Sequence, residues 1–348
     1  SLSLNWLLFD FGGREATLRN AHALLVAAQA TEDATLQAVF DTAAKDYYAA
    51  QAAIGALAAA RDVEQMTDAS LAAAQARSNR GVAPITDALQ AQTQHEQAVL
   101  NLTQARGQAL TALGALASDM DLTPGTPLRV PAVTEDKPPV KTFTQTITAM
   151  IEAVRQSHPA VKAAQAQYQA ALAKAAQIRA QGLPSITLVA QDSLDNQPQS
   201  MGLGLPTYPA TGHQAYVGVQ VSVKLFEGFS RQYQIEQAQA QAEQQRYAFD
   251  DARQKVALDM WSSYQTLSTA TQNVTHSENL LAIAAQAWQA ARKRYDSGVG
   301  SILELMNTQA ALANARQRHI QAITDWHYAR VDLASKLGQL DAADVQAH

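Results

Sequence analysis

The sequence contains no cysteine, few aromatic residues and no long apolar stretch. Without cysteine there is no disulfide framework and no thiolate metal site. No stretch of 18 consecutive apolar residues is present, so no transmembrane helix is predicted. The net charge of −5 argues against the basic surface that binding to nucleic acid requires. No signal peptide is recognisable at the start of the chain.

The most abundant residue types in the sequence favour helix formation. Alanine, glutamine and leucine dominate, and 16% of the 348 residues are charged. This composition is typical of long helices that pack through small side chains. By length alone the chain could form two ordinary domains.

One long segment occurs twice in the chain. Phe9 corresponds to Phe226 and Gly81 to Gly298, and the difference in residue number is 217 for both pairs, so no gap is needed. Such a repeat predicts that the chain is built from two copies of one structural unit.

Each copy contains one long predicted helix, over 14–80 in the first copy and 231–297 in the second. At a rise of 1.5 Å per residue such a helix is about 100 Å long. Apolar residues alternate at spacings of four and three from Leu36 to Leu57, which predicts a coiled-coil seam. A compact soluble domain has no use for helices of this length.

A return helix follows each long helix, from Pro84 to about Ala117 and from Ser301 to about Leu337. Pro84 suits the first turn of a helix. If Gly114 corresponds to Gly338, the second copy contains one additional heptad, an insertion that would keep the packing face.

Two segments, 1–9 and 214–226, alternate between apolar and polar residues and predict strands. A further strand is expected over 185–191, after Leu183-Pro184. Residues 192–213, which contain several glycines and prolines, are expected to form an exposed loop. The apolar face of the last strand consists of Val217, Val219, Val221, Val223 and Leu225. A two-faced strand of this length is long enough for an outer-membrane barrel, in which these residues would face lipid.

The predicted fold is mainly α with a small β part, and its long helices form antiparallel coiled coils in two repeats. Short helices are expected from Phe143 to Ser157 and from Pro159 to about Ala180. We divide the chain into a partial first repeat, a proline-rich linker, a second repeat and a tail, with bounds 1–118, 119–142, 143–340 and 341–348.

Four segments together resemble the TolC family of outer-membrane efflux channels, and the resemblance covers essentially the whole chain. They are Trp6 to Arg14, His158-Pro159 followed by Arg179 to Pro184, Leu225 to Gly228, and Arg294 to Val299. The resemblance implies a homotrimer in which each protomer gives four strands to a twelve-stranded barrel, while the helices form a periplasmic tunnel.

The first repeat is expected to be incomplete. Shifted by the repeat offset, the counterpart of Pro159 would fall at position −58, before the start of the sequence. One long helix and one strand of the first repeat are therefore expected to be missing, together with any signal peptide or lipid-anchor cysteine.

The resemblance also implies that the turns between the long and return helices form the gate. The gate residues would be Gly81, Thr86, Asp87, Tyr295, Gly298 and Glu304. The residues that contact a periplasmic adaptor protein would be Arg80, Val82, Val299 and Gly300.

The two acids in these turns, Asp87 and Glu304, match each other at the repeat offset. Tyr295 and Asp87 resemble a pair that holds the gate closed, and Glu304 an acidic constriction of the pore. The arginine expected at this gate is Gly300 here, and Asn307 stands at a position that is often acidic. Without the resemblance, both acids would be interpreted as solvated residues near helix N-termini, where the helix dipole favours them.

No catalytic residues, metal site or cofactor are predicted. The histidines show no ligand spacing and are interpreted as surface or capping residues: His158, His213, His276, His319 and His327. The first hypothesis is a passive export channel in the outer membrane, whose partners are membrane lipid, the adaptor and an inner-membrane pump of the RND or ABC type. The alternative is a structural coiled-coil spacer, which would have no need of a two-faced strand. Drug efflux and type I protein secretion both remain open.

Overall fold

A computed structural model describes residues 1–131, 147–199, 204, 206 and 208–338 of the chain. It divides into two compact units, Ser1–Asp33 with Pro159–Lys255 (unit 1) and Ala34–His158 with Val256–His348 (unit 2). The elements in chain order are β1 (Leu2–Phe9), α1 (Gly13–Asn79), α2 (Ile85–Asp119), α3 (Ile147–Ser157), α4 (Pro159–Ala180), β2 (Ser185–Gln199), β3 (Tyr208–Ser222), α5 (Ser230–Asp296) and α6 (Ile302–Lys336).

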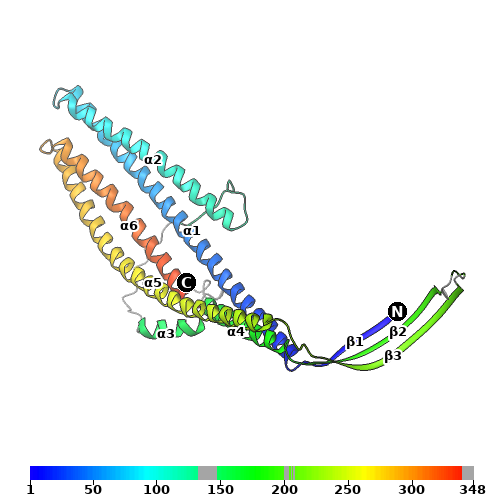
Figure 1. The fold of residues 1–348 in the computed structure, drawn as a ribbon. Helices are drawn as coiled ribbons and strands as arrows, with labels where there is room; N and C mark the ends of the chain where they lie inside the picture. The colour runs from blue at the N-terminus through cyan, green and yellow to red at the C-terminus, as the bar shows by residue number, and fades with distance from the viewer. Residues whose placement is uncertain (132–146, 200–203, 205, 207, 339–348) are drawn as a thin grey trace. The chain divides into compact units, whose positions relative to one another are not determined.

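The two long helices are present as predicted. Helices α1 and α5 each span 67 residues without a break, and both contribute residues to both units (Figure 1). The predicted seam is correct only in part: Ala50 is fully buried, whereas Leu36 is 69% exposed. In the described part of the chain, no helix is both long and apolar enough to cross a membrane.

The return helices correct one prediction. Helices α2 and α6 both contain 35 residues, so no heptad is inserted between the copies. The equivalent of Gly338, which has φ +68°, is Asp121, which has φ +57°. The N–H of Leu122 donates to the carbonyl of Ala117 at 2.8 Å and closes this helix end. The prediction failed because the left-handed residue is an aspartate, which tolerates this conformation, and not the glycine at 114.

The two short helices break where the sequence predicts. The break between α3 and α4 lies at His158, and Pro159 is the first residue of α4. The predicted helix start at Phe143, residues 132–142 of the linker and the tail at 341–348 lie outside the described residues.

The core of unit 2 depends unequally on the return helices. Helix α6 buries large side chains such as Leu312, Trp326 and Leu333, and α5 contributes the fully buried Met260. The buried residues of α2 are alanines apart from Leu116. The alanines of α2 allow close helix approach but bury little apolar area. The large side chains in the core of unit 2 therefore come mainly from α5 and α6 of the second repeat.

Unit 1 contains an antiparallel sheet in the order β1-β2-β3 (Figure 1). Residues opposite one another lie on the same face, because side chains alternate along each strand. One face therefore carries three aligned apolar rows: Leu4, Ala190 and Val217; Trp6, Leu188 and Val219; and Ile186 with Val221.

The extent of the last two strands differs from the prediction. Strands β2 and β3 continue through most of the expected loop and leave only residues 200–207 between them. Pro198 lies opposite Pro209, beyond the end of β1, where both strands have a free edge that tolerates proline. At the other end β3 stops at Ser222, because its partner strand begins at Ser185 and offers no further residue to pair. Val223 and Leu225 thus lie outside the strand.

A polar cluster lies among α1, α5 and α6 in unit 2. The hydroxyl of Ser263 donates to Asp332 at 2.5 Å, and Lys336 lies 3.6 Å from the same carboxylate. One carboxylate oxygen of Asp41 is buried and has no hydrogen-bond partner among the described residues. Burial, followed by the nearby charge of Asp332, raises the pKa of Asp41, against a smaller lowering by Lys336 and Lys45. Burial and the two aspartates also raise the pKa of Tyr328 to about 12.

Asp41→Asn is expected to stabilise the protein at neutral pH. The folded-state pKa of Asp41 is raised, so folding favours the protonated acid, and that contribution is lost as pH rises from the ordinary value of 3.8 through the folded value. The variant should therefore unfold at a higher temperature than the wild type at pH 8 and at a similar temperature at pH 3.5. Circular dichroism of the full-length protein at both pH values measures this. The exposed Asp68→Asn is the control, and an equal gain in both variants would contradict the role of Asp41.

Candidate functional site: the two helix–helix turns

The turns that follow α1 and α5 have the same backbone structure. Gly81 and Gly298 have φ of +73° and +79°, a conformation that strongly favours glycine. The next residue in each turn closes the helix end by a hydrogen bond, from Val82 N to Arg77 O at 3.1 Å and from Val299 N to Arg294 O at 3.0 Å. Each turn is thus a Schellman motif. The donor residues of the two hydrogen bonds are 217 positions apart, as are the acceptor residues.

The helices after the turns begin differently. Ser301 caps α6, because its hydroxyl accepts the backbone N–H of Glu304 at 3.1 Å. Pro84 occupies the equivalent position before α2 and offers no side-chain cap. Both acids lie in the first turn of their helix, where the helix dipole favours a negative charge.

Tyr295 lies in an apolar cluster that joins all four helices near the turns. Its side chain is 3% exposed and packs with residues of α1, α2 and α6, namely Ala74, Ala91, Ile302, Leu305 and Met306. Burial raises the pKa of Tyr295; Arg77 opposes this rise, and the charges of Asp87 and Asp296 add to it. The ring therefore anchors the last turn of α5 to the neighbouring helices.

Arg77 connects the first turn to the second. Its Nη1 donates to the carbonyl oxygen of Tyr295 at 2.7 Å. Its guanidinium carbon lies 4.8 Å from the centre of the Tyr295 ring, within the range of a cation–π contact. Arg77 was not among the site residues predicted from the sequence.

Glu304 forms an ion pair within its own turn, with Arg294 Nε 3.3 Å from its carboxylate oxygen. Gly300 lies directly against this arginine, and its N–H donates to Arg294 O at 3.0 Å. A Cβ at position 300 would lie 2.9 Å from Tyr295 N and 3.0 Å from the Arg294 backbone carbon. The turn in this conformation therefore has no room for the arginine that the family resemblance leads one to expect at this position.

Tyr295 and Asp87, predicted as a pair that holds the gate closed, are not joined by a hydrogen bond in this structure. The tyrosine hydroxyl is buried and has no hydrogen-bond partner among the described residues. Asp87 is close enough for its charge to raise the tyrosine pKa, but no direct bond joins the two. The other predicted tip residues on the first turn are exposed: Arg80, Gly81, Val82 and Thr86. Their roles in a gate or an adaptor contact remain predictions.

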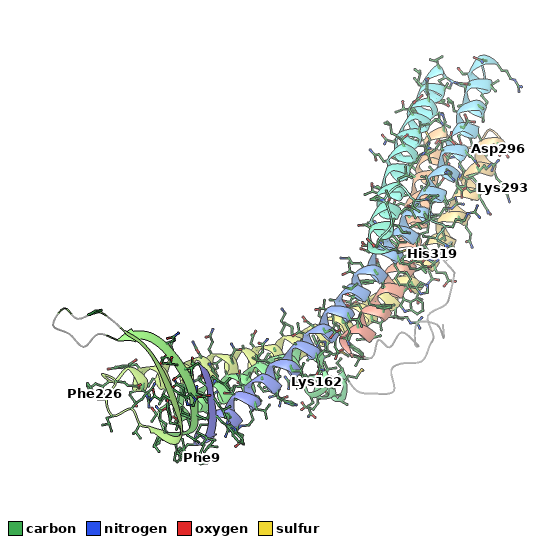
Figure 2. The ribbon with its side chains drawn as sticks, turned by 90° about the vertical axis from the view of Figure 1, so that its right-hand side faces the viewer. Phe9, Lys162, Phe226, Lys293, Asp296 and His319 are labelled. Atoms are coloured by element: carbon green, nitrogen blue, oxygen red, sulfur yellow. The ribbon has the colours of Figure 1, made fainter. Side chains whose placement is uncertain are left out.

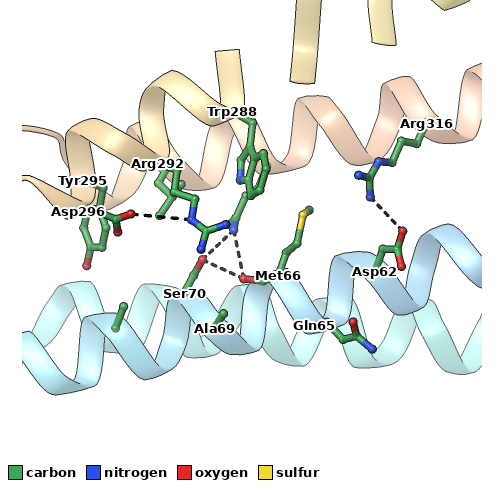
Figure 3. Close-up of a pocket in the computed structure, with 13 residues that line it drawn as sticks. Asp62, Gln65, Met66, Ala69, Ser70, Trp288, Arg292, Tyr295, Asp296 and Arg316 are labelled. Atoms are coloured by element: carbon green, nitrogen blue, oxygen red, sulfur yellow. Dashed lines mark hydrogen bonds and ion pairs between the residues drawn. The ribbon is translucent and has the colours of Figure 1, made fainter. Parts of the chain in front are cut away.

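A cavity of about 400 Å³ lies beside the turns, between α1, α5 and α6 (Figure 3). Trp288 of α5 points toward Met66 of α1 across it, and its ring nitrogen is buried without a hydrogen-bond partner among the described residues. Arg316 bridges the cavity to Asp62 at 3.3 Å. Gln309 donates to Ser70 Oγ at 2.7 Å. No local pattern marks these residues as neighbours, because the helices that carry them belong to different repeats and are far apart in the chain.

The predicted lipid-facing residues lie in unit 1. Val217, Val219 and Val221 share the apolar face of the sheet and are exposed, as are Val223 and Leu225 beyond the strand. Exposed phenylalanines mark both strand–helix junctions, with Phe9 and Phe226 labelled in Figure 2. They form edge-on pairs with ring-centre distances of 4.7 Å for Phe9–Phe11 and 6.0 Å for Phe226–Phe229.

This fold is also found in solved outer-membrane channels. The outer-membrane channel OprN matches with a TM-score of 0.82 at 17% identity, covering 97% of this chain and 74% of that chain. VceC from Vibrio cholerae matches with a TM-score of 0.80 at 17% identity, covering 97% of this chain and 78% of that chain. At these identities the similarity establishes the fold.

The chain belongs to the outer membrane efflux protein family, whose sequence profile matches residues 1–119 and 150–339. Protein CyaE of Bordetella pertussis is 30% identical over 347 residues, which is 99% of this chain and 71% of CyaE. The alkaline protease secretion protein AprF of Pseudomonas aeruginosa is 29% identical over 130 residues, 37% of this chain and 27% of AprF. The resemblance to TolC-type channels is thereby confirmed, and the family is one of transport proteins and not of enzymes.

Proposed function

We propose that this chain is the subunit of a trimeric duct that exports cargo across the outer membrane of a Gram-negative bacterium. The observation that carries the proposal is the family match over nearly all described residues, together with 30% identity to CyaE across the chain. In this proposal the sheet joins a shared barrel and the helices line a periplasmic tunnel. An inner-membrane pump of the RND or ABC type and a periplasmic adaptor supply the cargo and the energy.

The sheet in unit 1 supports a membrane role. Its apolar rows end at the strand–helix junctions beside the exposed phenylalanine pairs, and aromatic girdles of this kind lie at the interfaces of outer-membrane barrels. Beyond the other end of the rows the same face carries a polar pair, in which Asp192 Oδ1 lies 2.6 Å from His213 Nε2. An apolar band between an aromatic border and a polar border fits the hydrocarbon layer of a membrane.

The turns in unit 2 support a gate that also meets the adaptor. Exposed apolar side chains of both turns, Val82 and Val299, offer contact area to a partner protein. Glu304 contributes an acidic group that threefold symmetry would repeat as a ring around the pore. A ring of carboxylates favours cations over anions.

The cargo is proposed to be a protein. AprF, one of the two named relatives, is called an alkaline protease secretion protein. Efflux of small molecules is the second candidate, because the family description names efflux.

Two measurements test the function. The full-length protein, purified and added to planar lipid bilayers, is expected to give discrete ion conductance and to have the mass of three subunits; absence of both would favour the coiled-coil spacer. Deleting the gene in its host is then expected to remove at least one protein from the culture medium. Unchanged secreted proteins together with increased drug sensitivity would favour small-molecule efflux.

A further inference from the structure

The two repeats use an equivalent arginine in different ways. Arg77 and Arg294 are related by the repeat offset, and the carbonyl of each closes the turn that follows it. Arg294 pairs with Glu304, the acid in the first turn of the next helix of the same repeat. By symmetry Arg77 would pair with Asp87, yet its side chain contacts Tyr295 of the other repeat.

Chemistry explains this difference. Aspartate is one methylene shorter than glutamate, so Asp87 reaches less far toward an arginine in its own turn than Glu304 does. Tyr295 meanwhile offers Arg77 both a carbonyl oxygen and a ring face, and a planar guanidinium can use both at once. Arg77 also lies against the second turn itself, because a Cβ on Gly298 would be 3.7 Å from Arg77 Nη2.

We propose that Arg77 is the positioning residue that fastens the first turn to the second and thereby holds the gate in this conformation. This inference rests on the proposed function of the turns as a gate. The fastening acts through the ring and the carbonyl oxygen of Tyr295, and not through its hydroxyl. That hydroxyl has no hydrogen-bond partner among the described residues, so Asp87 is not the bonded partner of Tyr295 in this state. Opening then requires that Arg77 leave Tyr295.

Single-channel recording on the full-length protein tests this assignment. Arg77→Ala should raise the open probability about tenfold, which corresponds to about 1.4 kcal/mol. Tyr295→Phe keeps the ring and the carbonyl, so its open probability should stay within about twofold of the wild type. Arg61→Ala, which removes an exposed arginine of the same helix outside the turns, is the control and should leave the open probability unchanged. The inference is overturned if Arg77→Ala gates like the wild type, if Arg61→Ala opens the channel equally, or if Tyr295→Phe opens it as much as Arg77→Ala does.

A distance measurement separates failure of this inference from failure of the proposed function. Spin labels on Val82→Cys and Val299→Cys report the separation of the two turns whether or not the protein conducts ions. With Arg77→Ala the distance distribution should broaden and shift outward, and with the control Arg61→Ala it should not. An unchanged distribution in Arg77→Ala overturns the inference, whereas absence of conductance in the wild type contradicts only the channel proposal.

Discussion

Replacing Val219 with arginine is expected to destabilise the membrane-inserted form of the protein by about 2–4 kcal/mol, the range for a cation on the lipid side near the bilayer midplane. Val219 lies opposite Leu188, which in turn lies opposite Trp6, so it occupies the middle row of the apolar face. An arginine there would place a charge among apolar side chains. In the proposed trimer each of the three protomers would carry the change, so assembly should fail.

The control for Val219→Arg is the adjacent residue on the opposite face. Gln220 lies opposite Thr187, and in the proposed barrel it faces the water-filled lumen. Gln220→Arg should therefore assemble nearly as well as the wild type. The amount of folded trimer in isolated outer membranes, separated by electrophoresis without heating, measures both variants. Equal loss from the two substitutions would contradict the assignment of the lipid face.

Glu304→Gln is expected to change the ion selectivity of the channel. Glu304 and Arg294 form a partly exposed ion pair, which leaves the charges of the proposed ring nearly balanced. Removing the carboxylate leaves the arginine, so cation preference and block by divalent cations should both decrease. At a separation of about 6 Å in water two unit charges interact by about 0.7 kcal/mol, so the change in relative permeability should be about threefold.

Arg294→Ala should shift the selectivity in the opposite direction, because it exposes the carboxylate of Glu304. Reversal potentials in a salt gradient across a planar bilayer measure both variants, and low salt enlarges the difference because screening is weaker. Asp296→Asn is the control, since Asp296 is also an exposed acid near this turn and its carboxylate pairs with Arg292 of the same helix. Selectivity that moves in the same direction in Glu304→Gln and Arg294→Ala would contradict the ring.

Much of the fold was available from local sequence patterns. The predicted ends of both long helices agree with the observed ends to within one residue. Such helices and their glycine caps are determined by residues close together in the chain, which is why the sequence could predict them. The offset of 217 residues between the repeats makes Arg294 the counterpart of Arg77, so the sequence could have marked both arginines as candidates for the site. The apolar alternation of residues 215–221 likewise determined which face of β3 is apolar.

The tertiary structure decided features that depend on a partner distant in the chain. Strand β3 ends at Ser222, although its alternation continues, because β2 has no residue left to pair with it. The end of helix α2 is closed around Asp121, which the sequence does not mark as a left-handed position. Arg77 and Tyr295 are 218 residues apart, and their contact depends on how the helices pack. No local pattern encodes such a contact, since the equivalent arginine of the second repeat, Arg294, pairs instead with Glu304 in its own turn.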